Sequence, residues 1–545
     1  MARIKPRILK GFRDYTPDLM IARRDMLSRV AVVFERYGFS PLDTPALEYS
    51  EILLGKYGDE AEKLLYRFED NGKRDICLRY DLTIPLARVV AQHTELPSPF
   101  KRYQIGNVWR AESPGRGRFR EFTQCDIDIV GSSSLTADAE CLVVDLAVME
   151  ALGVDAEVRI NNRKVFRGLQ ERLGVEDSRA MNNVLRVIDK LPKVGEEGVR
   201  AELADELKLE AARIDAVIEF CRITGTNAEI FEQLERLLGE SEIGMQGIGE
   251  LRTVLKYAYA QGVREADVKL DPSIARGLDY YTGTVFETFL RNLDGFGSVM
   301  SGGRYDDLVG LYAGQQIPAV GVSVGLDRLL AGLIELGAIR ERKTVSEVLV
   351  TVFSPDQLDY SMKIANSLRQ ANVKAELYLD PEAKFRKQMK YANTLGIPCV
   401  AIAGPDEAAS GKVTLRDMLN GEEAQVDLDD LGAIANQWLG RVRGFDEDHR
   451  SWAWPWEPEV IKRVSEVRGL YILRSGTREA LKVGYVDKSR LKSHLLSFFG
   501  STEAENVVSF DWYEIGDTRL GCALEAFLTE RLLKSDASTD ITKPN

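Results

Sequence analysis

Two arginines and one aspartate stand in sequence contexts that indicate a binding site. Arg110 ends the run FKRYQIGNVWR just before a glycine-rich loop, and Arg328 ends GVSVGLDR where a helix is expected to begin. Arginine binds phosphate and carboxylate oxygens through a planar fork of donors and stays charged. Asp128 lies within an apolar run, where an unpaired carboxylate is costly, so a polar ligand explains it better than solvent does. A surface ion pair remains the ordinary role of either arginine taken alone.

The elements that must position these residues follow from local periodicity. Apolar residues recur at helical spacing over 18–37, and residues 38–48 are expected to be extended. Strand patterns at 75–79, 100–110 and 124–130 surround the loop 114–117, which favours an antiparallel sheet built around that loop.

Further along the chain the pattern changes more than once. A Leu/Ala/Glu-rich stretch at 163–261 predicts a helical insertion, after which strands return at 284–290 and 319–324. Alternating strand and helix patterns from 347 to 403 predict a small α/β domain with a mixed sheet. The Trp- and Pro-rich segment 444–458 is typical of a linker before a separate C-terminal unit.

Composition bounds the class of protein. With 545 residues, of which 44% are hydrophobic and 29% charged, the chain is expected to form roughly three to four domains. No run approaches the ~20 apolar residues of a membrane span, so a cytoplasmic protein without a membrane partner is expected. The six cysteines form no CxxC pair, so no metal site is assigned. The net charge of -13 makes local basic patches, rather than the whole surface, the candidates for nucleic-acid contact.

Several motifs together resemble a known family. The segment GFSPLDTPALE at 38–48 and the contexts of Arg110 and Arg328 resemble the signature segments of class II aminoacyl-tRNA synthetases. ARGLDYYTGTVFE at 275–287 and SGGRYDDL at 301–308 resemble segments peculiar to the histidyl-tRNA synthetase family. Ordinary strand packing is the alternative for Tyr280 and Tyr281 without this context.

The resemblance implies an α+β multidomain fold and a domain order. The expected parts are a class II antiparallel-sheet catalytic core with a helical insertion, an α/β anticodon-binding domain and a small α/β C-terminal domain. The boundaries placed on the sequence are 1–165 and 263–340 for the core, 166–262 for the insertion, 345–435 for the anticodon-binding domain, 436–465 for a linker and 466–545 for the accessory domain.

The resemblance also implies a reaction and its residues. Histidine would be activated with ATP and Mg²⁺ to histidyl-adenylate and pyrophosphate, then transferred to the 3′ end of tRNA(His); fixed guanidinium groups suit the charge on the phosphate oxygens. The catalytic residues implied are Arg110, Arg276 and Arg328. ATP would be held by Arg110, Glu112, Phe122 and Arg328. Histidine would be held by Asp81, Thr83, Gln124, Asp128, Tyr280 and Tyr281. No general base for the transfer step is assigned.

Contacts to the transfer RNA are expected at two places. Arg116 and Arg118 belong to a local concentration of basic residues that also includes Lys101, Arg102, Arg110 and Arg120, and they would meet the acceptor end. Lys384, Arg386 and Lys387 would contact phosphates in the anticodon-binding domain, with Phe385 packed inward. Family members of this kind are homodimers, so a homodimer is expected.

The C-terminal unit resembles GIY-YIG nuclease domains in part. Tyr471, Arg490 and Glu525 match a tyrosine, an arginine and a metal-binding glutamate of those domains, but Lys482 replaces the second tyrosine. An accessory RNA-binding role and a bifunctional synthetase with nuclease activity both remain open. A third alternative is a regulatory paralogue of the synthetase, although such relatives generally lack the anticodon-binding domain.

Overall fold

The chain divides into two compact units, Met1–Lys343 and Thr344–Asn545. The computed structural model describes residues 4–55, 64–188, 190–274, 280–339, 342–418, 421–443, 454–455, 469–474, 480–486, 495 and 509–514. No helix in these ranges is long and apolar enough to cross a membrane.

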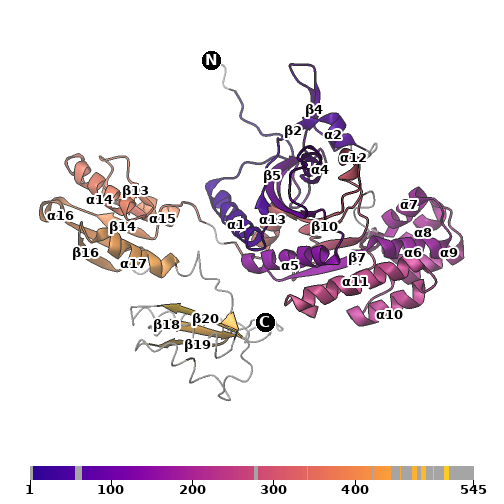
Figure 1. The fold of residues 1–545 in the computed structure, drawn as a ribbon. Coiled ribbons are helices and arrows are strands. Elements are labelled where there is room, and N and C mark those ends of the chain that lie inside the picture. The colour runs from indigo at the N-terminus through magenta and orange to yellow at the C-terminus, as the bar shows by residue number, and fades with distance from the viewer. Residues whose placement is uncertain are drawn as a thin grey trace, which may run out of the picture. The chain divides into compact units, whose positions relative to one another are not determined.

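The first unit is built on one large sheet (Figure 1). Among its described residues, the eight strands follow the order β1 (Ser40–Pro41), β5 (Phe100–Trp109), β6 (Glu121–Val130), β11 (Ala319–Gly325), β10 (Met300–Arg304), β9 (Thr284–Leu290), β7 (Ala156–Asn162) and β8 (Val268–Leu270). The pairs from β5 to β7 are antiparallel, whereas β1 and β8 join the two edges in parallel. The predicted antiparallel sheet and its strands at 100–110, 284–290 and 319–324 are confirmed.

The sheet has an apolar face and a polar face because side chains alternate along each strand. On β6, Cys125, Ile127 and Ile129 belong to the main core, together with side chains of α1 (Pro17–Arg36) and α5 (Leu135–Leu152). The intervening residues Gln124 and Asp128 are buried on the opposite face. Gln124 and Asp128, two of the residues that the sequence marks as functional, therefore project from the side of the sheet opposite α5.

Smaller elements complete the first unit. A three-stranded sheet contains β2 (Leu47–Tyr49), β4 (Asp75–Leu78) and β3 (Arg67–Glu69), and the remaining short helices are α2 (Ser50–Leu54), α4 (Thr83–Gln92), α12 (Gly310–Ala313) and α13 (Leu326–Glu335). The predicted helical stretch forms α6 (Arg163–Leu173), α7 (Ser178–Ile188), α8 (Leu191–Asp205), α9 (Ala211–Cys221), α10 (Asn227–Leu238) and α11 (Glu242–Ala260), followed by the 3-10 turn Glu265–Asp267. These helices gather beside β7 and share its core (Figure 1).

The second unit begins with the predicted α/β domain and its mixed sheet. Its strand order is β13 (Ala375–Leu377), β12 (Val348–Val350), β14 (Cys399–Ile402), β15 (Lys412–Asp417) and β16 (Glu423–Asp427), with β12 parallel to both of its neighbours. The helical elements are the 3-10 turn Pro355–Gln357, α14 (Leu358–Gln370), α15 (Phe385–Leu395), α16 (Pro405–Ser410) and α17 (Leu431–Arg443). The last helix, α17, continues to Arg443, and its residues Trp438 and Leu439 are buried in the domain core. It therefore extends past position 436, where the sequence places the start of a linker.

A further antiparallel sheet follows α17 in the same unit. Its order is β17 (Trp454–Pro455), β20 (Ser509–Glu514), β18 (Gly469–Arg474) and β19 (Ala480–Val486). The pair Trp454–Pro455 lies within the predicted linker but forms an edge strand against β20.

Candidate active site

Arg110 begins the loop between β5 and β6 and is held by its neighbours. Its backbone N–H donates to Arg120 O at 2.8 Å, and its Nε donates to Tyr80 O at 3.0 Å. The guanidinium carbon lies 5.2 Å from the centroid of the Phe122 ring, on the polar face of β6. Phe122 therefore supports a fixed guanidinium, and the remaining donors of Arg110 can meet an anion.

Arg328 lies in the first turn of α13, which directly follows β11. Its Nη2 donates to Phe296 O, and its guanidinium carbon is 5.2 Å from the Phe296 ring centroid. The β5–β6 loop touches the same helix, because a Cβ at Gly117 would lie 3.4 Å from the Arg328 Cα; Gly117 has a φ of +64°, which glycine adopts readily. The loop that starts at Arg110 thus packs on the helix that carries Arg328.

Asp327, next to Arg328, anchors this helix. Its carboxylate accepts hydrogen bonds from Arg13 Nη2 at 3.1 Å, from the Thr123 N–H at 2.7 Å and from the Tyr15 hydroxyl, and Arg23 Nε lies 3.4 Å away. Burial and the Asp327 charge raise the pKa of Tyr15 to about 12, so the hydroxyl keeps the proton that it donates. The N-terminal segment, α1, β6 and α13 meet at one buried carboxylate.

Asp128 has protein partners that the sequence did not reveal. Arg102 Nη2 lies 2.6 Å from Asp128 Oδ2, and the Tyr305 hydroxyl donates to Oδ1. Burial raises the pKa of Asp128 to about 6, whereas Arg102 and Tyr305 favour the ionised form. Gly321 makes room for this carboxylate, because a Cβ there would overlap Oδ1. The premise that Asp128 lacks a partner was therefore wrong, since strand pairing places Arg102 opposite it.

Tyr280 and Tyr281 form an aromatic wall at the start of the segment leading into β9. Their ring centroids are 4.2 Å apart, and the Tyr280 ring is 6.3 Å from that of Tyr305 in an edge-on arrangement. Burial raises the pKa of Tyr281, to which the nearby Asp128 and Asp126 carboxylates also contribute. Tyr281 therefore lies near the acidic residues of β6, and Tyr280 lies near Asp81.

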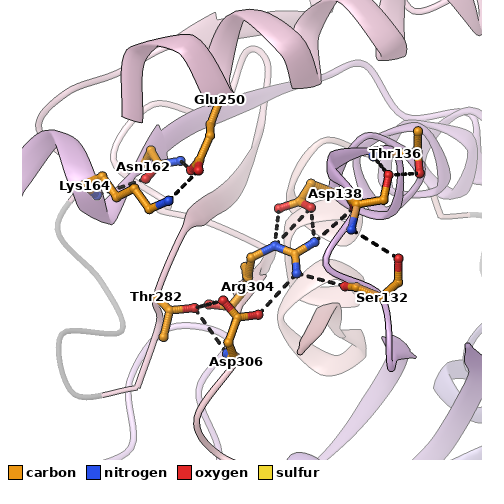
Figure 2. A network of polar contacts seen from close by, with 10 residues as sticks. Ser132, Thr136, Asp138, Asn162, Lys164, Glu250, Thr282, Arg304 and Asp306 are labelled. Carbon is orange, nitrogen blue, oxygen red and sulfur yellow. Dashed lines mark hydrogen bonds and ion pairs between the residues drawn. The ribbon is translucent and has the colours of Figure 1, made fainter. Parts of the chain in front are cut away.

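A buried arginine holds the segment that carries these tyrosines. Figure 2 shows Arg304 between Asp138 and Asp306: its Nε lies 3.1 Å from both Asp138 oxygens and its Nη1 lies 3.2 Å from Asp306 Oδ1. Asp306 also accepts from the Thr282 hydroxyl at 2.8 Å. Tyr305 directly follows Arg304. The end of β10 is therefore joined to α5 by the Arg304–Asp138 ion pair and to β6 by the hydrogen bond from Tyr305 to Asp128.

The residues expected near the substrate ammonium lie around the same face. Asp81 Oδ1 accepts from the Ile84 N–H at 3.1 Å at the start of α4, whose first residue is Thr83. Burial raises the pKa of Asp81, while the Arg110 and Arg102 charges lower it. Gln124 Nε2 donates to Ser323 Oγ at 2.7 Å. Asp81 therefore holds the first turn of α4, and its contact with a ligand stays a prediction.

The basic residues near the loop do not form one surface. Arg102 is 0% exposed, and Lys101 pairs with Glu140. Arg120 Nε donates to the Glu112 carbonyl at 2.9 Å, whereas the Glu112 side chain is partly exposed. The basic residues that are close in sequence therefore do not form one exposed surface; alternation along β5, for example, sends Lys101 and Arg102 to opposite faces.

Two basic residues at the loop tip remain exposed. Arg116 forms an ion pair with Glu335, with Nε donating at 2.9 Å, and lies 5.1 Å from the Phe296 ring centroid. Arg118 is exposed beside the turn that its N–H closes on Gly115 O. Arg118 is consequently the more available of the two for an anionic partner.

In the α/β domain, Lys384, Arg386 and Lys387 are exposed at the start of α15. Phe385 between them is 41% exposed, so its expected inward packing was wrong. In the C-terminal sheet, Tyr471 is buried and pairs with Gly484 across the β18–β19 hairpin. Arg276, Arg490 and Glu525 lie outside the described residues.

Sequence reasoning missed several partners in the site, namely Arg102, Tyr305, Arg304, Ser323 and Asp327. The signal that could have found Arg102 is the i, i+2 spacing of polar residues on both β5 and β6. The spacing identifies Arg102 as the partner of Asp128 only when the β5–β6 register, in which these two residues are opposite each other, is known.

Comparisons with known proteins find similar sequences and a similar fold. A family model described as "Histidyl-tRNA synthetase" matches residues 11–329, and one described as "Anticodon binding domain" matches residues 347–438. The chain is 45% identical over 425 residues to a histidine–tRNA ligase of Rhodopirellula baltica, covering 78% of this chain and 96% of that relative. It is 46% identical over 433 residues to a histidine–tRNA ligase of Clostridium tetani, covering 78% and 97%. A crystal structure of histidyl-tRNA synthetase from Nostoc sp. PCC 7120 superposes with a TM-score of 0.72 at 33% identity, covering 80% and 100%.

Proposed function

We propose roles for the residues of this site from one premise: the chain belongs to the histidyl-tRNA synthetase family and is a histidine–tRNA ligase. The observation that carries this conclusion is the identity of about 45% over nearly the whole length of curated ligases. The matched anticodon-binding domain also argues against the regulatory paralogue, which generally lacks it.

The experiment that tests the function is ATP–pyrophosphate exchange with each of the twenty amino acids. Exchange is expected with histidine and ATP in the presence of Mg²⁺, and with no other amino acid at a comparable rate. Exchange that another amino acid supports better than histidine would overturn the function. Arg276→Ala is expected to lower exchange by orders of magnitude, and Asp128→Asn to impair histidine selection.

For the activation step, Arg110 binds the α-phosphate of ATP and the histidine carboxylate, and Arg328 binds the γ-phosphate. Support comes from the way both guanidinium groups are fixed beside an aromatic ring and a carbonyl, so that little reorganisation is needed when an anion binds. Phe122 stacks on adenine and Glu112 hydrogen-bonds to it. Arg276 adds a positive charge beside the reacting carboxylate.

Mg²⁺ accompanies the triphosphate in this proposal. The described residues contain no group of three His, Cys, Asp or Glu side chains that could hold a metal ion by themselves. No protein ligand is therefore assigned. When bound, the ion would neutralise charge on the phosphate oxygens.

Histidine is selected on the polar face of β6. Asp81, Thr83 and Gln124 hold the ammonium group, Asp128 accepts a hydrogen bond from the imidazole, and Tyr280 and Tyr281 form its wall. The adjacent, tilted tyrosine rings and the nearby buried carboxylates support this assignment. Such a site rejects amino acids that lack the ring N–H, because they leave a buried polar group unpaired.

Arg116 and Arg118 meet the acceptor end of tRNA(His), with Arg118 the stronger candidate because Arg116 already pairs with Glu335. Arg118→Ala is expected to raise KM for tRNA in aminoacylation while exchange stays unchanged. Equal losses in both assays would contradict the assignment.

The anticodon bases stack at the carboxyl edge of β12 and β13. Phe353 is 57% exposed just beyond β12, and Phe385 is exposed at the start of α15. Buried Gln388 joins the two positions, because its Nε2 donates to Val352 O at 2.7 Å and to Ala383 O at 2.9 Å. Aromatic platforms beside basic side chains are how proteins bind single-stranded bases.

Lys384, Arg386 and Lys387 supply the positive charge of this surface, although Lys387 also lies 3.2 Å from Asp380. Because base stacking contributes about 1–3 kcal/mol per base, Phe353→Ala and Phe385→Ala are each expected to raise KM for tRNA by about five- to 150-fold. Met362→Ala is the matched control, since Met362 is 48% exposed on α14 of the same domain. An unchanged tRNA KM in both phenylalanine variants would exclude this surface.

We also propose that the ligase is a cytoplasmic homodimer, which sedimentation of the purified chain tests for the oligomeric state. The C-terminal sheet is proposed to act as an accessory RNA-binding module, with Tyr471, Arg490 and Glu525 as candidate residues. Metal-dependent cleavage of RNA or DNA that disappears in Glu525→Ala would favour the bifunctional alternative instead.

A further inference from the structure

A second carboxylate, Asp126, lies on the polar face of β6 between two residues already assigned to the histidine site. Strand alternation places Asp126 on the same side as Gln124 and Asp128, opposite the core residues Cys125 and Ile127. The register sets it across from Gln104 on β5 and Ser323 on β11. Asp126 is therefore in the middle of the sheet, at the centre of the proposed substrate face.

The partners of Asp126 leave part of its carboxylate available. The Ser323 hydroxyl hydrogen-bonds to the Asp126 carboxylate and accepts from Gln124 Nε2 at 2.7 Å. Asp126 is 3% exposed, yet its Oδ1 makes no hydrogen bond to any residue that the structure describes. The Gln124 Oε1 atom is likewise buried without a hydrogen bond to any described residue. Buried polar atoms in this state are costly unless a ligand or water completes them.

The charges around Asp126 favour a ligand that brings hydrogen-bond donors or positive charge. Asp81 and Asp128 both raise the pKa of Asp126, and burial is the largest cause of its rise to about 7. Arg102 opposes this rise and acts on all three carboxylates. Two guanidinium groups, Arg102 and, at Asp81, Arg110, therefore face three carboxyl groups, and this balance favours a ligand that brings a donor.

The choice of ligand group follows from the neighbours. Asp81, Thr83 and the Gln124 side chain already serve the substrate ammonium in the proposed arrangement. The charges of Asp126 and Asp128 both raise the pKa of Tyr281, so Asp126 lies near the ring that forms the wall of the proposed imidazole pocket. An imidazole has two nitrogen atoms, and full recognition needs a partner for each. Asp128 can serve one nitrogen.

We propose that Asp126 is a further histidine-selecting residue, whose Oδ1 hydrogen-bonds to the imidazole nitrogen that Asp128 does not reach. This inference rests on the proposed function of the site. A carboxyl group that can hold or release a proton near neutral pH is able to partner either a bare or a protonated ring nitrogen.

The test is pyrophosphate exchange by the full-length chain with Asp126→Ala, Asp126→Asn and the control Asp145→Asn. Asp145 is a matched control because it is also fully buried with a pKa raised by burial to about 7, but it lies on α5 and accepts from the Thr288 hydroxyl at 2.6 Å. Asp126→Ala is expected to raise KM for histidine by about ten- to 100-fold, with KM for ATP changed less than twofold. Asp145→Asn is expected to change neither value.

The two ring-methylated histidines identify the contact. Each isomer blocks one imidazole nitrogen, so Asp126→Ala is expected to improve the activity of one isomer relative to histidine by about tenfold or more. A folded Asp126→Ala variant with histidine KM within twofold of the parent and the same ranking of isomers overturns the proposal. A purely structural role would give that result together with a lowered melting temperature.

If Asp126→Ala does not fold, Asp126→Asn decides the matter because its shape is nearly unchanged. It is expected to raise histidine KM by about fivefold or more, and a value within twofold of the parent overturns the proposal. Absence of histidine-dependent exchange in the parent chain would instead overturn the proposed function itself.

Discussion

Replacing Arg102 with Met tests how the histidine face tolerates its buried charges. Arg102 is 0% exposed, and its Nη2 lies 2.6 Å from Asp128 Oδ2 and 3.2 Å from Leu82 O. Methionine keeps the volume of the aliphatic chain but removes the positive charge. Breaking one side of a buried ion pair costs about 3–5 kcal/mol, because the remaining charge loses its compensation.

The size of the loss should depend on pH in a defined direction. The pKa of Asp128 is about 6 even with Arg102 present, and it rises further without that positive charge. An acid whose folded pKa is raised destabilises the fold as pH rises through that range, because the folded protein must release a proton that it binds well. Arg102→Met should thus lower the unfolding free energy more at pH 8 than at pH 5.

A double variant separates charge from packing. Adding Asp128→Asn to Arg102→Met removes the uncompensated carboxylate and is expected to restore at least half of the lost stability. Recovery is incomplete because Asp126 and Asp81 also lose the Arg102 charge. Arg102→Lys is the matched control that keeps the charge without the planar fork.

The assay is urea unfolding of the purified chain followed by circular dichroism at pH 5 and pH 8. The midpoint should fall while the denaturant slope stays constant, as for a change in stability alone. The reasoning is refuted if Arg102→Met at pH 8 lies within about 1 kcal/mol of the parent, or if adding Asp128→Asn brings no recovery.

Three further variants probe the parts that position the site. Gly321→Ala should cost about 1–3 kcal/mol and weaken histidine binding, because the new Cβ overlaps Asp128 Oδ1; calorimetric titration with histidine that matches the parent would contradict this. Burial raises the pKa of Asp145 to about 7, so the unfolding free energy of the parent should decline by up to roughly 4 kcal/mol between about pH 4 and pH 7. Asp145→Asn should flatten this decline, and parallel pH profiles of the two proteins would exclude Asp145 as its origin. Asp327→Asn weakens the contacts that hold α13 and should destabilise the first unit by roughly 3 kcal/mol. It should also reduce kcat for exchange, because it displaces Arg328. A variant with lowered stability but full kcat would show that Asp327 is structural only.

Local sequence pattern was sufficient for most elements and for the family to which the chain belongs. Helix and strand periodicity depends on neighbouring residues, so the predicted strand at 100–110 appears as β5 and the helical spacing over 18–37 appears as α1. The contexts of Arg110 and Arg328 were likewise readable, because each signature segment is contiguous. The helical insertion followed from composition alone.

The partners of the site residues depended on tertiary structure. Arg102 looked like one member of a local concentration of basic residues, and Asp128 like a carboxylate without a partner, until the β5–β6 register paired them. Phe385 looked like a core residue, but buried Gln388 occupies the inner position of that turn and leaves the ring exposed.

Alternation within a strand is a local property that the sequence displays, whereas register, face and burial arise from contacts between distant segments. The sequence by itself therefore determined which residues could do chemistry and which family they belong to. Only the tertiary structure decided which of the buried charges neutralise one another and which, such as Asp126, keep an oxygen without a hydrogen bond to any described residue.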